Sequence, residues 1–371
     1  MRLSRSSLNK AGAALLCAVF LLSAGCAADR LVTLPSANRE MLVAVLPVEN
    51  LSGGTAPLAP LRRALMKTAA GAGLKVVPEA EVDRFIREHR IRYTGGVDEE
   101  ISQSLKTQLQ ANAVLVTSLE LYNEDVPPKI ALMSRLVSTG ERPEILWMES
   151  VALAGDEEPG ALNLGMILEP KKLQEKVMER LARSLGQGLS GGVAPAGAGA
   201  RYKPKVAFAA FGDQGDRKPT VAVFPFLNQS TRKNAGEMLV LHCVKQLVDS
   251  GQVAVVEPGV LRNRMLQMRI IMDDGVALPQ VDLISRAMHV DYIVTGKVYE
   301  YQDYMGEIGR PKVDFSLQVI EGTEKKVVWA SKSYNEGNDG VYFYDWGRTY
   351  TAAALAQKMA RAVVQRMLAE Q

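Results

Sequence analysis

The sequence contains few residues of the types that carry chemistry. Among 371 residues there are three cysteines and three histidines, and aromatic residues make up 6%. The histidines, His89, His242 and His289, stand far apart, and there is no His-x-x-x-His or Cys-x-x-Cys spacing, so the sequence predicts no metal site. Glycines between residues 191 and 199 do not follow a strand and open a helix, as a phosphate-binding loop requires. We therefore expect no cofactor and no enzymatic activity.

Long apolar runs are missing from the sequence, except for one stretch at the N-terminus. Three basic residues precede an apolar stretch at residues 11–22, which suits a signal peptide and is shorter than the ~20 residues that span a bilayer. The stretch ends in LSAGC at residues 22–26, which resembles a bacterial lipobox. We predict a lipoprotein signal peptide over residues 1–25 and lipidation of Cys26 by fatty acids such as palmitate. An ordinary secretory signal with a chance cysteine is the alternative.

Neither sign of charge is in excess once this signal is removed. The whole chain has 44 Lys and Arg against 41 Asp and Glu, and the three basic residues of the signal account for the difference. Because nucleic-acid binding needs a basic stripe, we expect no nucleic-acid partner. Cys17 leaves with the signal and Cys26 would be acylated, so Cys243 has no partner for an internal disulfide. Its apolar helical surroundings predict a buried residue.

Lipidation would fix the protein to a bilayer without a spanning helix. Each buried CH₂ of an acyl chain contributes ~0.8 kcal/mol, so several chains hold a protein firmly. Residue 27, directly after Cys26, is not Asp, which resembles the outer-membrane default of enteric bacteria. We predict a lipid anchor on the periplasmic face of the outer membrane, with residues 26–39 as the tether.

An internal repeat organises the remaining chain. The sequence VAVLPVENLS at residues 43–52 recurs as VAVFPFLNQS at residues 221–230, 178 residues later. At the same offset, Leu115 to Ser118 recurs as Ile293 to Gly296, and Trp147 recurs as Trp329 at an offset of 182. A Gly/Ala/Pro-rich segment between the copies is typical of a flexible linker. The expected parts are a first domain over residues 40–188, a linker over residues 189–202 and a second domain over residues 203–371.

Each copy is predicted to fold as an α+β domain in the order β-α-β-α-α-β-β-β-α. The opening strand is a continuous apolar run, which indicates burial on both faces. In the second copy, Val313, Phe315, Leu317 and Val319 alternate with polar residues, as in a half-exposed antiparallel strand. We expect two tandem mixed sheets, each ending in an antiparallel meander and each covered by helices on one face.

At this point the sequence resembles a family. Residues 221–230, the segment DYIVTG at residues 291–296 and the Trp in the third meander strand are similar to CsgG-type envelope lipoproteins. This group includes the curli secretion lipoprotein, the penicillin-binding-protein activator LpoB and the amino-terminal domain of TolB. The resemblance implies a CsgG/TolB-N fold, like that of anticodon-binding domains, and a periplasmic protein that binds envelope proteins. Assembly into a homo-oligomer is left open.

Two features are candidates for partner binding. The first is the loop after each opening strand, which contains Asn50 or Asn228; N-capping of the next helix is the structural alternative. The second is the aromatic cluster Tyr342, Phe343, Tyr344 and Trp346, because aromatic residues dominate protein interfaces. Packing of the last helix onto the sheet is the alternative for this cluster.

The leading functional hypothesis is a non-enzymatic, protein-binding accessory of envelope assembly or secretion. One alternative is a lipoprotein activator of a peptidoglycan synthase. The tether argues against it, because residues 27–38 span only ~40 Å at full extension. The other alternative is a subunit of a ring-forming, CsgG-like secretion channel. The short connections between the predicted meander strands argue against it, because a membrane hairpin needs ~9–11 more residues per crossing.

Overall fold

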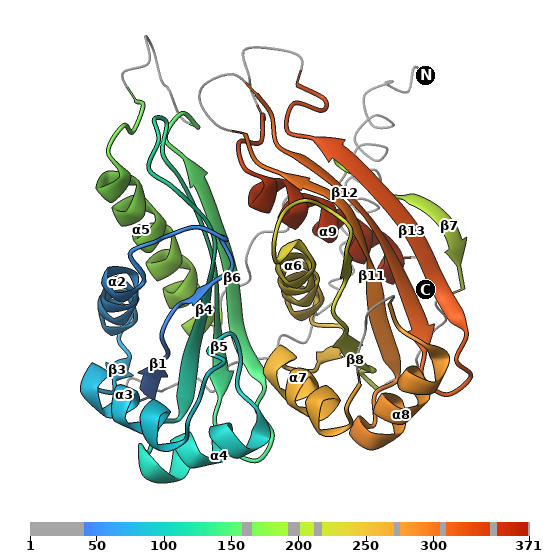
Figure 1. Ribbon diagram of the computed structural model, residues 1–371, viewed down its shortest axis with the longest axis horizontal. Coiled ribbons are helices and arrows are strands. Elements are labelled where there is room, and N and C mark those ends of the chain that lie inside the picture. The colour runs from blue at the N-terminus through green and yellow to red at the C-terminus, as the bar shows by residue number, and fades with distance from the viewer. Residues whose placement is uncertain are drawn as a thin grey trace, which may run out of the picture. The chain divides into compact units, whose positions relative to one another are not determined.

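Two mixed β-sheets with helices on both of their faces make up the part of the chain that the structure describes (Figure 1). The structure is a computed structural model, and the α+β class agrees with the prediction. We call residues 41–191 the first half and residues 201–369 the second half. The described ranges are 41–157, 165–191, 201–210, 217–270, 275–304, 309–341 and 347–369.

The first half contains six strands and four helices among these residues. They are β1 (Leu42–Val45), β2 (Glu49–Asn50), α2 (Leu58–Gly71), β3 (Lys75–Val76), α3 (Glu79–Glu88), α4 (Glu99–Gln108), β4 (Ala113–Asn123), β5 (Lys129–Ser138), β6 (Ile145–Ala154) and α5 (Pro170–Leu189). The strand order is β3-β1-β4-β5-β6, and β2 also pairs with β4. β1 is parallel to β3 and β4, and the last three strands form the predicted antiparallel meander.

The second half repeats this order and adds one strand. Its elements are β7 (Lys205–Ala209), β8 (Thr220–Val223), β9 (Leu227–Asn228), α6 (Ala235–Ser250), β10 (Ala254–Val255), α7 (Pro258–Gln267), α8 (Leu278–Met288), β11 (Tyr292–Gln302), β12 (Lys312–Glu321), β13 (Val327–Glu336) and α9 (Ala352–Ala369). The order is β10-β8-β11-β12-β13-β7, with β9 beside β11. The edge strand β7 was not predicted. That the halves are copies of one ancestral domain remains a prediction, although their topologies agree.

Local sequence patterns account for the helices. In α5, Leu173, Val177, Leu181 and Leu185 recur every four residues and are all buried. The start of α4 is fixed by Asp98, whose carboxylate accepts a hydrogen bond of 2.8 Å from the backbone N–H of Ile101. The start of α4 and the packing of α5 are therefore both accounted for by local sequence.

Helices cover both faces of each sheet, whereas we predicted them on one face only. In β4, Leu115 packs in a cluster with α2 and α5, and its neighbour Val114 packs in a cluster with α3 and α4. In β11, Val294 lies in the cluster with α6 and α9, and Ile293 lies in the cluster with α7 and α8. The apolar runs of β1 and β8 require this burial on both faces.

The strand pairings also correct the sequence alignment of the two halves. Val45 pairs with Leu115 and Val223 pairs with Val294. Because Val45 and Val223 hold the same place in the recurring sequence, Leu115 corresponds to Val294 and not to Ile293. A shift of one residue matters, since neighbouring residues of a strand face opposite sides of the sheet.

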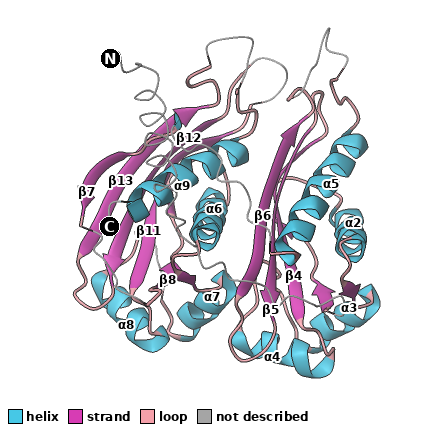
Figure 2. Cartoon of the chain, turned by 180° about the vertical axis from the view of Figure 1, so that it is seen from behind, coloured by secondary structure: helices cyan, strands magenta, loops and turns pink. Residues whose placement is uncertain are grey.

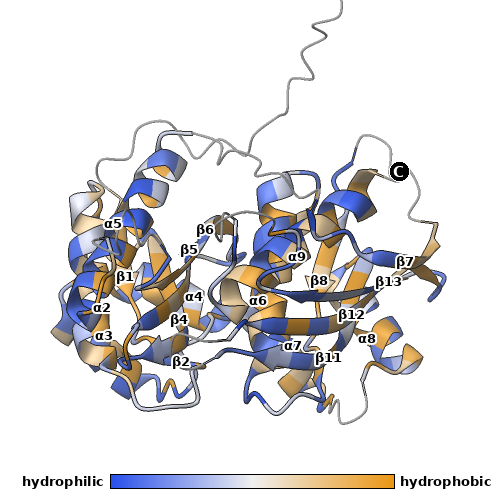
Figure 3. Cartoon of the chain, turned by 90° about the horizontal axis from the view of Figure 1, so that it is seen from above, coloured by the Kyte–Doolittle hydropathy of each residue, from blue (hydrophilic) through white to orange (hydrophobic). Residues whose placement is uncertain are grey.

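Helices α6 and α9 lie between the two sheets (Figures 2 and 3). Met133 and Met148 of the first sheet share one core with Leu239 of α6, Met359 of α9 and Phe315 of the second sheet. The layers therefore follow in the order α2 with α5, first sheet, α6 with α9, second sheet. The described residues of both halves belong to one compact unit.

Candidate partner-binding surface

Asn50 and Asn228 close the loops in which they lie. The Asn50 side-chain oxygen accepts hydrogen bonds from the N–H and hydroxyl of Ser52, at 3.1 and 2.6 Å, and its amide donates to the Gly54 carbonyl at 2.8 Å. Asn228 does the same, accepting from Ser230 and donating to the carbonyl of Arg232 at 2.7 Å. These side chains form Asx turns, and a role in partner binding stays a prediction.

The alternative reading of these residues as helix N-caps is wrong. The N-cap of α2 is Pro57 and that of α6 is Asn234. Instead, the two loops meet where the halves join: the Asn234 amide donates to the carbonyl of Leu51 at 3.3 Å. Their first function is therefore to connect the halves.

Two other candidates lie outside the described residues. They are Cys26, the predicted lipid-acceptor residue, and the aromatic cluster Tyr342, Phe343, Tyr344 and Trp346. Cys243 is described and buried, as predicted, and burial raises the pKa of its thiol to about 12. A thiol that stays protonated in an apolar core is not a nucleophile.

Ionisable groups are buried where the halves meet. The guanidinium of Arg135 on β5 lies 2.7 Å from a carboxylate oxygen of Glu257, which precedes α7, and both side chains are fully buried. His242 of α6 lies 3.2 Å from Glu120 of β4, and this pair is also buried. Next to Arg135 the backbones of the two halves approach each other closely: a Cβ at Gly96 would lie 2.8 Å from the Cα of Gly259.

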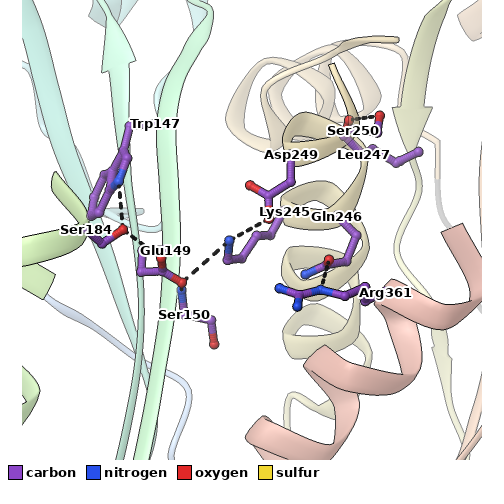
Figure 4. A network of polar contacts seen from close by, with 10 residues as sticks. All are labelled: Trp147, Glu149, Ser150, Ser184, Lys245, Gln246, Leu247, Asp249, Ser250 and Arg361. Atoms are coloured by element: carbon purple, nitrogen blue, oxygen red, sulfur yellow. Dashed lines mark hydrogen bonds and ion pairs between the residues drawn. The ribbon is translucent and has the colours of Figure 1, made fainter. Parts of the chain in front are cut away.

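A second polar network crosses from α5 through β6 to α6 (Figure 4). The indole N–H of Trp147 donates to Ser184, whose hydroxyl donates to Glu149 at 2.6 Å. Glu149 lies 3.5 Å from the ammonium of Lys245, which pairs with Asp249 at 2.7 Å. Beside it, Arg361 of α9 donates to Gln246 at 3.1 Å. Lys245 is buried, whereas its partners Glu149 and Asp249 are partly exposed, so the network joins the elements at the edge of the shared core.

The corresponding faces of the two sheets differ in what covers them. In the first sheet, Met133 lies between its partners Ser118 and Ser150 and is buried under α6. The same place in the second sheet is held by Ser316, between Lys297 and Lys332. Apart from the end covered by α7 and α8, this second face is exposed among the described residues. We call it the open face. Its residues are Phe208, Lys297, Tyr299, Asp314, Ser316, Lys332 and Tyr334.

Exposed aromatic side chains distinguish the open face. Tyr299 is 39% exposed, and Tyr334 and Phe208 are each 49% exposed. The ammonium of Lys332 lies 4.8 Å from the centre of the Tyr299 ring and 3.5 Å from the carboxylate of Asp314. Tyrosines held in place by charged neighbours are typical of protein-binding surfaces.

The Tyr334 hydroxyl donates a hydrogen bond of 2.8 Å to Glu336. This bond raises the pKa of the Tyr334 phenol to about 12 and lowers the pKa of the Glu336 carboxyl. Arg310 and Lys312 pair with the same carboxylate at 2.6 and 3.3 Å. The open face thus presents the Tyr334 phenol next to a carboxylate that two basic side chains hold in place.

The described residues contain hollows, but no metal-type cluster and no long apolar helix. Two hollows of about 270 and 290 Å³ among these residues are lined by a mixture of charged, polar and apolar residues. In the described ranges, no group of three or more His, Cys, Asp or Glu residues could hold a metal ion. The same part of the chain has no helix with the length and apolar character needed to cross a bilayer.

The sequence analysis missed the open face, although a signal for it existed. The alternation in β12 places polar residues on one side, and the matching side of β5 carries Met133 and Ala131 instead. Comparing the two halves position by position would have indicated which face is covered.

Comparisons with known proteins give partial matches. No curated protein matches the chain. Among solved structures, the chain is similar to the PelC dodecamer from Paraburkholderia phytofirmans, with 17% identity over 45% of this chain and 95% of that one, at a TM-score of 0.31. Lipoprotein GNA1162 from Neisseria meningitidis is similar at 20% identity over 39% and 99%, with a TM-score of 0.30. The LpoB C-terminal domain from Escherichia coli is similar at 12% identity over 33% and 87%, with a TM-score of 0.25.

One family model matches by sequence. The matched segment, residues 204–334, runs from β7 to β13 and therefore includes the whole open face. The family is described as Peptidoglycan-synthase activator LpoB, and it is this family that the second half of the chain resembles.

Proposed function

We propose that this protein is an envelope lipoprotein that binds a peptidoglycan synthase and regulates it. The observation that carries the proposal is the match of residues 204–334 to the LpoB activator family. It favours what the sequence analysis held as an alternative over the more general reading of an assembly or secretion accessory. In this proposal the protein has no catalytic activity and acts by contact.

The open face is the proposed docking surface for the synthase. It lies within the matched segment, and Tyr299 and Tyr334 are exposed on it with charged neighbours. The matching face of the first sheet is buried under α6 and α9 and cannot take a partner. Binding through the second half alone would explain why the halves differ at these positions.

The proposed anchor at Cys26 keeps the protein on the periplasmic side of the outer membrane. With ~40 Å of tether, the partner has to reach toward the outer membrane with its own periplasmic domain. The proposal therefore implies a synthase with a long ectodomain.

The test is a polymerisation assay with a purified bifunctional peptidoglycan synthase of the same organism. Residues 27–371 are added, and glycan synthesis from lipid-linked precursor is followed over time. We expect faster synthesis with the wild-type protein and at least a tenfold weaker stimulation after Tyr299→Ala and Tyr334→Ala together.

Tyr122→Ala is the matched control. Tyr122 donates to Glu124 two residues on, as Tyr334 donates to Glu336, but it lies in the first half. It should leave the stimulation unchanged. If wild-type protein neither binds nor stimulates any synthase of the organism, the proposal is wrong.

A further inference from the structure

The outer sides of α2 and α5 form a basic surface. These helices pack against each other and against the first sheet, and their exposed residues include Arg63, Lys67, Lys171, Lys172 and Arg183. The sequence of α2 contains no acidic residue, and that of α5 contains Glu175 and Glu179. We call the outer side of this helix pair the basic face.

The spacing places these charges on one side. Arg63 and Lys67 are four residues apart on α2, and Lys172 and Arg183 are three turns apart on α5, so each pair projects in one direction. The exposed Glu175 and Glu179 lie between Lys172 and Arg183 on the same side of α5. Lys172 pairs with Glu169 at 2.6 Å, but both side chains are largely exposed, and such a pair contributes little. Five exposed basic side chains against two exposed acidic ones leave this helix pair with a net positive charge toward solvent.

The basic face and the open face lie at opposite ends of the layers. One side of the first sheet is covered by α2 and α5, and its other side is covered by α6 and α9, which also cover the second sheet. The open face is on the far side of that second sheet. A surface that contacts the basic face is thus separated from the open face by four layers.

We propose that the basic face rests on the anionic phospholipid leaflet to which the chain is anchored. This inference depends on the proposed anchor at Cys26 for its place in the cell. Only residues 27–40 separate that cysteine from Met41, the start of the described chain, so the first half stays near the bilayer. Clustered Lys and Arg residues at an anionic leaflet are attracted within about one Debye length. Resting in this way turns the open face toward the periplasm.

The experiment uses unacylated protein, residues 27–371, so that lipidation does not contribute. Vesicles of phosphatidylcholine with about 30% phosphatidylglycerol, which supplies the anionic headgroups, are compared with vesicles of phosphatidylcholine alone in a sedimentation assay. We expect binding to the anionic vesicles that weakens as salt increases, and none to the neutral ones.

A variant with Arg63→Gln, Lys67→Gln, Lys171→Gln and Arg183→Gln should bind anionic vesicles at least tenfold more weakly. The control carries the same number of neutralised charges on the second half: Lys203→Gln, Lys218→Gln, Arg269→Gln and Lys326→Gln. It should bind like the wild type. Circular dichroism of both variants checks that they fold.

Equal loss in both variants would overturn the proposal, because the attraction would then come from overall charge. Binding to immobilised polyglutamate without binding to anionic vesicles would overturn it in favour of an acidic protein partner. Neither readout uses a peptidoglycan synthase, so failure here and failure of the proposed function are separate outcomes.

Discussion

Single residues at the junction of the halves hold charge where water is excluded. Arg135 and Glu257 are both fully buried, and Arg135 also donates to the carbonyl of Gly95 at 2.5 Å. Removing one member of a buried pair leaves the other charge without its partner, which costs far more than losing an exposed pair. The effect of a substitution at this junction therefore depends on burial more than on the distance between the charges.

Arg135→Met should lower the free energy of unfolding by about 3–5 kcal/mol. Arg286→Met is the control, because Arg286 pairs with Asp282 at 3.0 Å but is 78% exposed; it should change stability by ~0.5 kcal/mol or less. Urea unfolding followed by circular dichroism measures both. Similar small effects in the two variants would mean that the Arg135 pair is accessible to water.

The buried carboxyl of Glu49 should make the stability of the folded protein depend on pH. Burial raises the pKa of its carboxyl above the ordinary 4.5. A hydrogen bond of 2.7 Å from the Ser118 hydroxyl lowers the same pKa, but the effect of burial is larger. The Glu49 carboxyl therefore stays protonated to a higher pH in the folded protein than in the unfolded chain. Its contribution to the free energy of unfolding is fully present below about pH 4.5 and is lost as pH rises through the folded pKa.

Glu49→Gln removes this loss while keeping an acceptor for Ser118. We expect the variant to unfold at a higher urea concentration than the wild type at pH 7 and at about the same concentration at pH 4. The measurement is the urea midpoint across this pH range. If the difference in urea midpoint between the variant and the wild type grows as pH falls, the pKa of Glu49 is not raised in the folded protein.

At the scale of elements, strands that hold matching places in the two halves have different surroundings. Met133 and Ser316 hold matching places in β5 and β12, yet one is buried beneath α6 and the other lies on the open face. Met133→Asp places a charge in the shared core and should destabilise the protein by about 3 kcal/mol or more.

Ser316→Asp is the matched substitution and should change stability by less than ~0.5 kcal/mol, because Lys297 and Lys332 flank it in solvent. Thermal unfolding of both variants gives the comparison. Equal destabilisation would mean that the open face is covered in solution.

Much of the element order could be predicted from the sequence, since periodicity reports which side of an element is apolar. The meander strands and the stripe of α5 are examples. The strand β7 could not be predicted, because its residues are mostly exposed and carry no alternating pattern. The open face was not predicted either. Tyr299 holds the place in β11 that Glu120 holds in β4, where it is buried against His242 of α6. The exposure of Tyr299 is informative only by comparison with that buried place.

At the scale of the whole molecule, the halves share one core. Residues of both sheets pack with α6 and α9 in a single cluster, so neither half keeps its apolar surface away from water without the other. α6 shows this dependence most strongly, with twelve buried residues distributed around its whole circumference. A helix that is buried on all sides, with mostly apolar residues, has to be enclosed by its neighbours.

The two halves should therefore unfold together. Trp147 reports on the first half and Trp329 on the second. In variants that keep only one of these two residues, with the other tryptophans replaced by Phe, the fluorescence transition in urea should coincide with the circular dichroism transition. If Trp147 changes at a lower urea concentration than the secondary structure, the first half unfolds on its own.

The contact between the halves is head-to-tail, with the sheet of one against the helices of the other. Contacts of that kind do not close on themselves and can continue from molecule to molecule into a fibre. On the open face, the second sheet has serine, lysine and aspartate residues, whereas the matching face of the first sheet has methionine and alanine. Growth by this contact therefore stops at two, and the substitutions that end the series leave the open face exposed to solvent.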